Sequence, residues 1–191
     1  MEEPKFQQLL VFIQQAMQRW HVPGVAVGVY HQGRQWTAGM GVTSVDLPLP
    51  VTEETLFQIG SISKTVTGTA ALRLVEQGKL DLDAPVRNVL PELELADEDA
   101  AANVTLRHLL THTGGWAGDY FDDTGGGDDA LQKILPRLKR LEQLTPVGEI
   151  WAYNNAGFYI AGRMIEVATG RVYEEAVRAL VLDPLGMKDC T

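Results

Sequence analysis

Strand-forming sequence is confined to one short region of this 191-residue chain. Residues 25–30 form a nearly continuous run of β-branched and small apolar side chains, which predicts a buried strand. A tight turn at residues 31–34 and a returning strand over 35–41 complete a hairpin. From about residue 60 onward the apolar spacing is mainly helical. Because an isolated hairpin is only marginally stable in water, we expect further strands or a helix to support this one.

An amphipathic helix is expected before the hairpin. Over residues 5–20, large apolar side chains recur at helical spacing with Gln and Lys between them: Phe6, Leu9, Leu10, Ile13, Met17 and Trp20. We therefore predict an α/β lobe at residues 1–59, which holds this helix and the hairpin, and a mainly helical lobe at residues 60–191. In the second lobe, helices are expected over residues 61–77, 105–110 with Thr105 as the cap, 130–144 with an interruption at Pro136, 156–169 and 173–182.

The start of the second lobe carries a serine and a lysine at a spacing that suits nucleophilic chemistry. Ser61 follows Gly60 at the mouth of the predicted helix, and Lys64 lies three residues later, so the two side chains project from one face. A lysine amine that is held neutral can accept the serine proton, and a helix N-terminus favours developing negative charge. The spacing predicts an activated alcohol. The alternative is that Ser61 only caps the helix and Lys64 is a solvated side chain.

Two patterns could suggest a metal. His108 and His112 are four residues apart, a spacing that can clamp zinc on a helix, but no glutamate lies between them and no third ligand is evident. The Asp- and Gly-rich residues 119–129 do not have the spacing of an EF-hand calcium loop. We therefore expect His112 to be a local hydrogen-bonding residue, residues 119–129 to be a solvated loop, and the chain to need no metal and no cofactor.

Composition excludes several classes of protein. With 45% hydrophobic and 21% charged residues the chain resembles a soluble globular protein, and a net charge of −9 argues against a nucleic-acid-binding surface. Cys190 is the only cysteine, so no internal disulfide is possible. No apolar run is long enough to cross a membrane, and the acidic start is unlike a signal peptide. The default location is the cytoplasm, or the periplasm or exterior if a signal has been removed.

Several motifs together resemble the superfamily of penicillin-binding proteins and serine β-lactamases, and most closely its branch of class C β-lactamases, carboxylesterases and D-amino-acid-specific peptidases. The stretch 57–64 matches the Ser-x-x-Lys motif, residues 153–155 match the Tyr-x-Asn motif, and residues 109–115 match the stretch between them. Other matching segments follow in the expected order: 78–83, 146–148 and 183–187.

This resemblance implies an active site between an α/β lobe and a helical lobe, in a β-lactamase/transpeptidase-like fold. Ser61 would attack a carbonyl and form an acyl-enzyme, with Lys64 as its base and its backbone N–H as one oxyanion donor. Tyr153, kept partly ionised by Lys64, would pass the proton to the leaving group. Asn155 would orient the substrate ester or amide. The alternatives are that Tyr153 is an interface aromatic and that Asn155, or Asn154, only caps the helix that follows.

One part of the family pattern has no match. The third motif, Lys-Thr-Gly or His-x-Gly on a strand that donates the second oxyanion N–H, is expected after the region matched here, together with the remaining strands of the sheet. We therefore expect these strands beyond residue 191, in the remainder of the protein or in a C-terminal partner chain, and expect the sheet of this chain to be incomplete.

The predicted function is that of a β-lactamase-type serine hydrolase acting on a small-molecule ester, amide or peptide. An esterase or peptidase is favoured over a dedicated β-lactamase, because no acidic deacylation residue is evident. Two alternatives remain open: a non-catalytic fragment or binding module that retains the fold but lacks the third motif, and a zinc hydrolase that uses His108 and His112.

Overall fold

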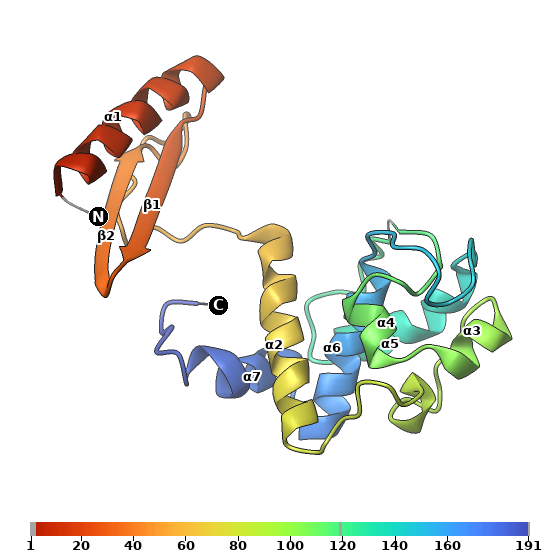
Figure 1. Ribbon diagram of the computed structural model, residues 1–191. Coiled ribbons are helices and arrows are strands. Elements are labelled where there is room, and N and C mark those ends of the chain that lie inside the picture. The colour runs from red at the N-terminus through yellow and green to blue at the C-terminus, as the bar shows by residue number, and fades with distance from the viewer. Residues whose placement is uncertain (1–2, 119, 191) are drawn as a thin grey trace. The chain divides into compact units, whose positions relative to one another are not determined.

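The computed structural model describes residues 3–118 and 120–190, and the chain divides into two compact units, Met1–Gln58 and Ile59–Thr191 (Figure 1). The first unit contains one helix and one hairpin. The second is helical. Every candidate site residue lies in this second unit.

The first unit matches the predicted helix and hairpin. Its elements are α1 (Glu3–Trp20), β1 (Gly24–His31) and β2 (Arg34–Gly41). The strands are antiparallel, with register from Gly24 opposite Gly41 to His31 opposite Arg34. The two turn residues have positive φ, which a type I′ hairpin turn requires. Helix α1 lies along the hairpin (Figure 1), and the Trp36 indole N–H donates to the Glu3 carboxylate across 3.1 Å.

The expectation that β1 is a buried strand was wrong. Its burial alternates: Val25, Val27 and Val29 are half-buried, whereas Ala26 and Gly28 between them are exposed. The run looked continuously apolar because small residues occupy the outward positions, and small residues tolerate either environment. Two paired strands form the whole sheet within the part of the chain that the structure describes.

The second unit is built around one central helix. Helix α6 (Ala156–Thr169) packs against α2 (Ser63–Glu76), α4 (Leu106–Leu110), α5 (Ala130–Ile134) and α7 (Tyr173–Val177). The largest fully buried side chains come from these helices and the loops between them, and include Leu74, Leu90, Leu93, Leu106, Leu109, Leu135, Ile160, Met164 and Ile165. Gly157 lets α6 approach α4 closely, because a Cβ there would lie 3.3 Å from the Leu109 carbonyl oxygen.

Most helix boundaries agree with the sequence pattern. Helix α6 ends at Gly170, whose φ of 66° is the left-handed conformation typical of a helix C-terminus. Thr105 caps α4, as predicted, and the structure adds a capping box with His108. The predicted helix over 173–182 is present, but it changes from α7 into a π-helical turn, η4 (Arg178–Leu182).

The predicted helix over residues 130–144 is shorter than expected. Helix α5 ends at Ile134, and a 3₁₀ segment, η3 (Leu135–Arg140), follows it. Pro136 has no N–H to donate and its ring crowds the preceding turn, so the α-helical ladder cannot continue through it. Leu141 is already extended, with φ −70° and ψ 121°.

The predicted helix over residues 61–77 begins with a 3₁₀ turn, η1 (Gly60–Ile62), before α2. Two short elements had not been predicted as helices: η2 (Val86–Asn88) and α3 (Glu98–Asn103). The sequence does hold a signal for α3. The Asp97 side chain accepts from the Ala100 N–H across 2.8 Å, and two acidic residues occupy the first turn, as is favourable at a helix N-terminus. Among the described residues, no helix combines the length and apolar character that a membrane crossing needs.

Candidate active site

Ser61 lies in a tight turn just before α2. Gly60, with φ of 53°, starts the 3₁₀ turn η1, and Ser61 is its second residue. The residue at the N-cap position of α2 is Ile62, which makes no side-chain capping bond. The capping interpretation of Ser61 is therefore wrong: its Oγ instead accepts from the Tyr153 hydroxyl across 2.6 Å and from Lys64 Nζ across 3.3 Å. Ser61 is exposed to solvent.

Lys64 is half-buried and its ammonium bridges two elements. Besides Ser61, Nζ donates to Asn155 Oδ1 across 2.8 Å, which joins the start of α2 to the start of α6. It lies 4.9 Å from the centroid of the Tyr153 ring and 5.4 Å from that of Phe158. No ion pair between Lys64 and a carboxylate occurs within residues 3–118 and 120–190. The amine is therefore directed at the serine by an amide oxygen and two aromatic faces.

Asn154 and Asn155, which precede α6, make different contacts. Asn155 occupies the N-cap position but makes no side-chain capping bond, because its Oδ1 accepts from Lys64. Asn154 does the capping instead, since its Oδ1 accepts from the Gly157 N–H across 2.9 Å. The same oxygen accepts from the Trp116 indole N–H across 2.8 Å, and the Asn154 side chain is buried. Asn154 therefore fixes the segment that carries Tyr153 and Asn155 onto the helical core.

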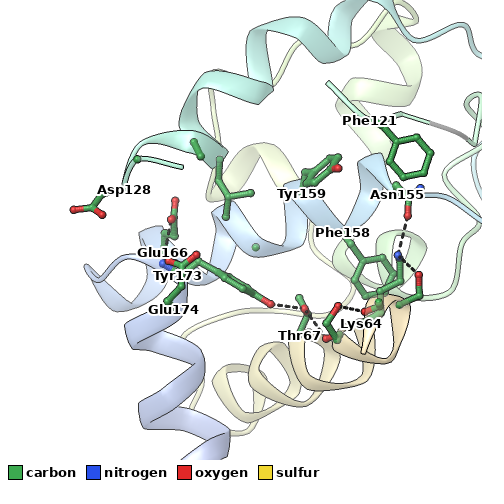
Figure 2. Close-up of a pocket in the computed structure, with 17 residues that line it drawn as sticks. Lys64, Thr67, Phe121, Asp128, Asn155, Phe158, Tyr159, Glu166, Tyr173 and Glu174 are labelled. Carbon is green, nitrogen blue, oxygen red and sulfur yellow. Dashed lines mark hydrogen bonds between the residues drawn. The ribbon is translucent and has the colours of Figure 1, made fainter. Parts of the chain in front are cut away.

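A pocket of about 450 Å³ opens beside Ser61 (Figure 2). Ser61, Lys64 and Asn155 lie at one end of it. Its lining includes several apolar and aromatic residues: Phe121, Leu131, Phe158 and Tyr159. Asp128, Glu166 and Glu174 lie at the far end, where Glu166 is balanced by an ion pair with Arg163 at 2.8 Å. The pocket therefore offers an apolar chamber next to the alcohol and an acidic far end.

Thr67 and Tyr173 form the polar part of the pocket wall. The Thr67 hydroxyl lies 2.6 Å from the Tyr173 hydroxyl and donates to the Ser63 carbonyl across 3.1 Å. Burial raises the pKa of Tyr173 above its ordinary value. These bonds tie α7 to the first turn of α2.

His108 and His112 each use a ring nitrogen in a hydrogen bond to a nearby backbone N–H group. His108 Nδ1 lies 3.2 Å from the Thr105 amide nitrogen, and His112 Nδ1 accepts from the Asn154 N–H across 3.0 Å. Burial lowers the pKa of both rings, and the charge of Lys64 lowers that of His112 further. No group of three or more His, Cys, Asp or Glu side chains in the described part of the chain could hold a metal ion. His112 is a local hydrogen-bonding residue, as predicted.

The Asp- and Gly-rich segment forms local contacts. Asp119 lies outside the described residues. Asp122 accepts from the Tyr120 hydroxyl across 2.9 Å, and Asp129 pairs with Lys133 at 2.7 Å. The bond to Tyr120 lowers the pKa of Asp122, while burial raises the pKa of Tyr120 to about 12.

Comparison with known proteins decides the family. The family model described as Beta-lactamase matches residues 11–191. The chain belongs to the β-lactamase family. It is 38% identical over 167 residues to penicillin-binding protein 4 of Amycolatopsis lactamdurans, a match that covers 87% of this chain and 44% of that relative. It is 37% identical over 195 residues to esterase EstB of Burkholderia gladioli, covering 94% of this chain and 49% of the relative.

Solved structures of this family show the same fold. The octameric penicillin-binding protein homologue from Pyrococcus abyssi superposes with a TM-score of 0.83 at 31% identity, covering 96% of this chain and 43% of that one. A class C β-lactamase superposes with a TM-score of 0.82 at 29% identity, covering 98% of this chain and 51% of that one. The predicted β-lactamase/transpeptidase-like fold is therefore confirmed. The chain spans about half the length of the β-lactamase-family relatives that it matches.

Proposed function

We propose that Ser61 is the nucleophile of a serine hydrolase that acts on an ester or amide through an acyl-enzyme. The observation that carries the proposal is that one serine oxygen lies within hydrogen-bond reach of both a phenol and an amine, Tyr153 at 2.6 Å and Lys64 at 3.3 Å. A nucleophile in contact with a base that is itself held by a third group is the usual arrangement of covalent catalysis. The esterases, penicillin-binding proteins and β-lactamases among the relatives support this class of reaction.

The proposed reaction begins with one proton removed from the Lys64–Tyr153 pair. Ser61 Oγ then bonds to the substrate carbonyl carbon while its proton passes to the pair, and the carbonyl oxygen takes up the negative charge. The Tyr153 hydroxyl, at 2.6 Å from Oγ, is the closer proton acceptor once it is ionised, and the Lys64 cation near its ring stabilises the phenolate.

The same proton completes the acyl transfer. It passes from Tyr153 to the departing alkoxide or amine as the carbonyl–oxygen or carbonyl–nitrogen bond breaks, which leaves an ester on Ser61. Water then adds to that ester and gives up a proton to the pair. Ser61 Oγ recovers a proton as the carboxylic acid leaves, so the enzyme returns to its starting state.

The tetrahedral oxyanion needs donors near Ser61. We propose the Ser61 backbone N–H as one, because the first N–H groups of a helical segment lack partners within it. The second donor is proposed to come from polypeptide additional to these 191 residues, either the remainder of the protein or a partner chain. The support is that the relatives are about twice as long as the matched region. Losing one such donor typically costs about 10²–10³ in rate.

The apolar residues of the pocket wall support an acyl group of apolar character. Phe121, Leu131 and Phe158 line the same pocket as the Ser61 alcohol. Asn155 is proposed to orient the substrate ester or amide, in addition to its bond with Lys64.

The test is acylation by a fluorophosphonate probe, read by intact mass and peptide mapping. We expect one adduct, on Ser61, that is absent from Ser61→Ala. Ser44→Ala is the matched control, since Ser44 lies in the first unit and only accepts from local backbone N–H groups. An adduct that requires the additional polypeptide supports the shared oxyanion site. Absence of an adduct both with and without the additional polypeptide refutes the hydrolase and favours a binding module that retains the fold.

A further inference from the structure

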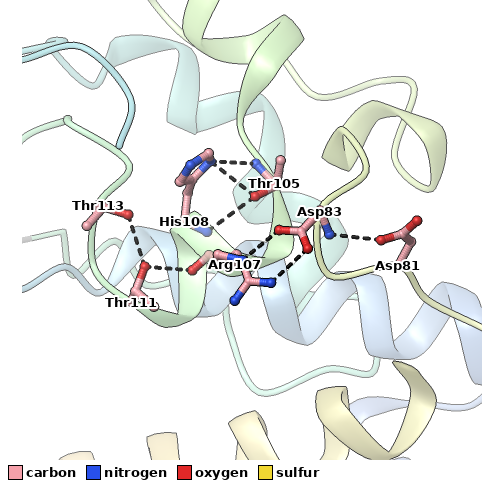
Figure 3. Close-up of polar contacts among 7 residues, drawn as sticks. All are labelled: Asp81, Asp83, Thr105, Arg107, His108, Thr111 and Thr113. Atoms are coloured by element: carbon pink, nitrogen blue, oxygen red, sulfur yellow. Dashed lines mark hydrogen bonds and ion pairs between the residues drawn. The ribbon is translucent and has the colours of Figure 1, made fainter. Parts of the chain in front are cut away.

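His112 is presented from a firmly held turn. It follows α4, whose N-terminus is fixed by the Thr105–His108 capping box, as Figure 3 shows. The Thr113 N–H donates to the His108 carbonyl across 3.0 Å, and the Gly148 N–H donates to the Thr113 carbonyl across 2.8 Å. His112 itself has φ of 58°, a conformation that is uncommon for a non-glycine residue and is maintained only where surrounding contacts enforce it.

Both chain neighbours of Tyr153 are hydrogen-bonded to this one histidine. The Ala152 N–H donates to the His112 carbonyl across 2.9 Å. The Asn154 N–H donates to His112 Nδ1 across 3.0 Å. The backbone on either side of Tyr153 is therefore bound to the same residue, once through the main chain and once through the imidazole.

The imidazole also contacts the phenol ring directly. The ring centroids of His112 and Tyr153 are 4.7 Å apart and their planes are inclined by 31°. Phe158 lies 5.3 Å from the imidazole centroid, and Trp151 meets it edge-on at 6.0 Å. Aromatic pairs at such separations prefer defined relative orientations, so this cluster limits the rotation of the Tyr153 side chain.

The hydrogen bond requires a neutral imidazole. Nδ1 accepts from Asn154 only when it carries no proton, which places the single ring proton on Nε2. Within the described residues, the titratable groups that contact or act on this ring are Lys64 on α2 and Tyr153. Burial and the Lys64 charge both lower the pKa of His112 and so favour the neutral form.

We propose that His112 is a positioning residue that holds the Tyr153 hydroxyl at Ser61, by binding the backbone on both sides of the tyrosine and stacking on its ring. The inference rests on the proposed function, in which Tyr153 exchanges a proton with Ser61. A displacement of about 1 Å at a reacting group can cost about a hundredfold in rate, so this restraint has a measurable kinetic consequence.

Three variants separate the contributions of the imidazole. His112→Asn keeps an acceptor oxygen near the Nδ1 position and tolerates positive φ. His112→Phe keeps a ring and loses the acceptor, and His112→Ala loses both. His21→Asn is the matched control, because His21 also has positive φ, at 54°, but lies exposed in the first unit. Thermal unfolding of each variant shows whether it is folded.

The kinetic test measures the rate constant and the dissociation constant of fluorophosphonate labelling at Ser61 separately. We expect the rate constant to fall about a hundredfold in His112→Ala and His112→Phe and less than about tenfold in His112→Asn, with little change in the dissociation constant. In the wild type, we expect the labelling rate constant to fall at acidic pH as His112 gains a proton. This fall should be absent from His112→Asn. Unchanged labelling rates in folded His112→Ala and His112→Phe would overturn the inference.

A second measurement does not depend on activity. In ¹⁵N-labelled protein, we expect a scalar coupling between the Asn154 amide nitrogen and His112 Nδ1, and a proton on Nε2. A protonated Nδ1 at neutral pH overturns the positioning role whatever the kinetics. If the wild-type protein forms no adduct at Ser61, the proposed function is refuted. The restraint by His112 then has no role in catalysis, even where the scalar coupling to Asn154 is present.

Discussion

The Tyr153 hydroxyl and Ser61 Oγ are joined by a 2.6 Å hydrogen bond, although 92 positions separate the two residues in the chain. Lys64, only three positions from Ser61, is more distant from it at 3.3 Å. Tertiary packing therefore brings Tyr153, the nearest partner, to the alcohol, whereas helix geometry places the second partner, Lys64. This relationship makes the phenol the first group to test.

Tyr153→Phe removes only the phenol oxygen. We expect Ser61 acylation to slow by about 10²–10⁴-fold, the usual contribution of a positioned acid or base. The ring remains to stack on His112, so the melting temperature should change little. Labelling kinetics and thermal unfolding measure the two effects. Tyr30→Phe, at an exposed tyrosine of the first unit, is the control. A Tyr153→Phe variant that labels at the wild-type rate would exclude the phenol as the base.

Gly118 allows the Tyr153 backbone to approach it closely. A Cβ at Gly118 would lie 2.4 Å from the Tyr153 carbonyl oxygen, nearer than real contacts permit. Gly118→Ala should therefore shift the Tyr153 segment, slow acylation and lower the free energy of unfolding by about 1–3 kcal/mol. Gly126→Ala is the matched control, because nothing lies within 4 Å of a Cβ there. Equal labelling and stability in the two variants would show that the segment adjusts without cost.

Asn154 satisfies several buried groups at once. Its Oδ1 accepts from Trp116 and Gly157, and its amide donates to two carbonyls in the adjacent loop. Asn154→Ala leaves buried donors unpaired, so we expect a loss of about 2–4 kcal/mol in the free energy of urea unfolding. Asn103→Ala, at an exposed asparagine that bonds only to Asp99, should cost about 0.5 kcal/mol or less. A loss below about 1 kcal/mol for Asn154→Ala would mean that water replaces these bonds.

The partly buried His108 and His112 predict a dependence of stability on pH. The pKa of His108 and that of His112 are both lowered from the usual 6.5, chiefly by burial. Below that value the unfolded chain binds more protons than the folded one, so the free energy of unfolding falls as the pH decreases. Urea unfolding between about pH 8 and pH 5 measures the slope.

Carboxylates with lowered pKa values, such as Asp83 bound to Arg107, lose their contribution at lower pH than the histidines do. His112→Asn should therefore reduce the slope between about pH 6.5 and 5, and His21→Asn should leave it unchanged. A slope that does not respond to His112→Asn would contradict a neutral, partly buried imidazole.

Much of the helical lobe follows from local sequence. Helix α6 shows apolar side chains at helical spacing and a terminal Gly170, and α4 begins at a Thr cap; both are local signals that tertiary packing did not change. The errors have physical causes as well. Pro136 ended α5 early, and the small outward residues of β1 made a half-exposed strand look buried.

The candidate site was only partly visible in the sequence. Tyr153 and Asn155 were found through family motifs, because no periodicity connects them to Ser61. His112 was predicted to be a local hydrogen-bonding residue, but its restraint on Tyr153 was missed, since nothing local indicates that its ring accepts from Asn154. The left-handed backbone at position 112 has only a weak signal in the sequence, because histidine adopts positive φ more often than most residues but still uncommonly.

The sequence by itself determined that Ser61 and Lys64 share one face, because a separation of three residues in a helical turn leaves their side chains little choice. Tertiary structure alone decided that Tyr153 meets Ser61 and that His112 binds both neighbours of that tyrosine. Those contacts depend on α4 and α2 packing against α6, and packing brings together residues whose separation in the chain carries no information about their distance in space.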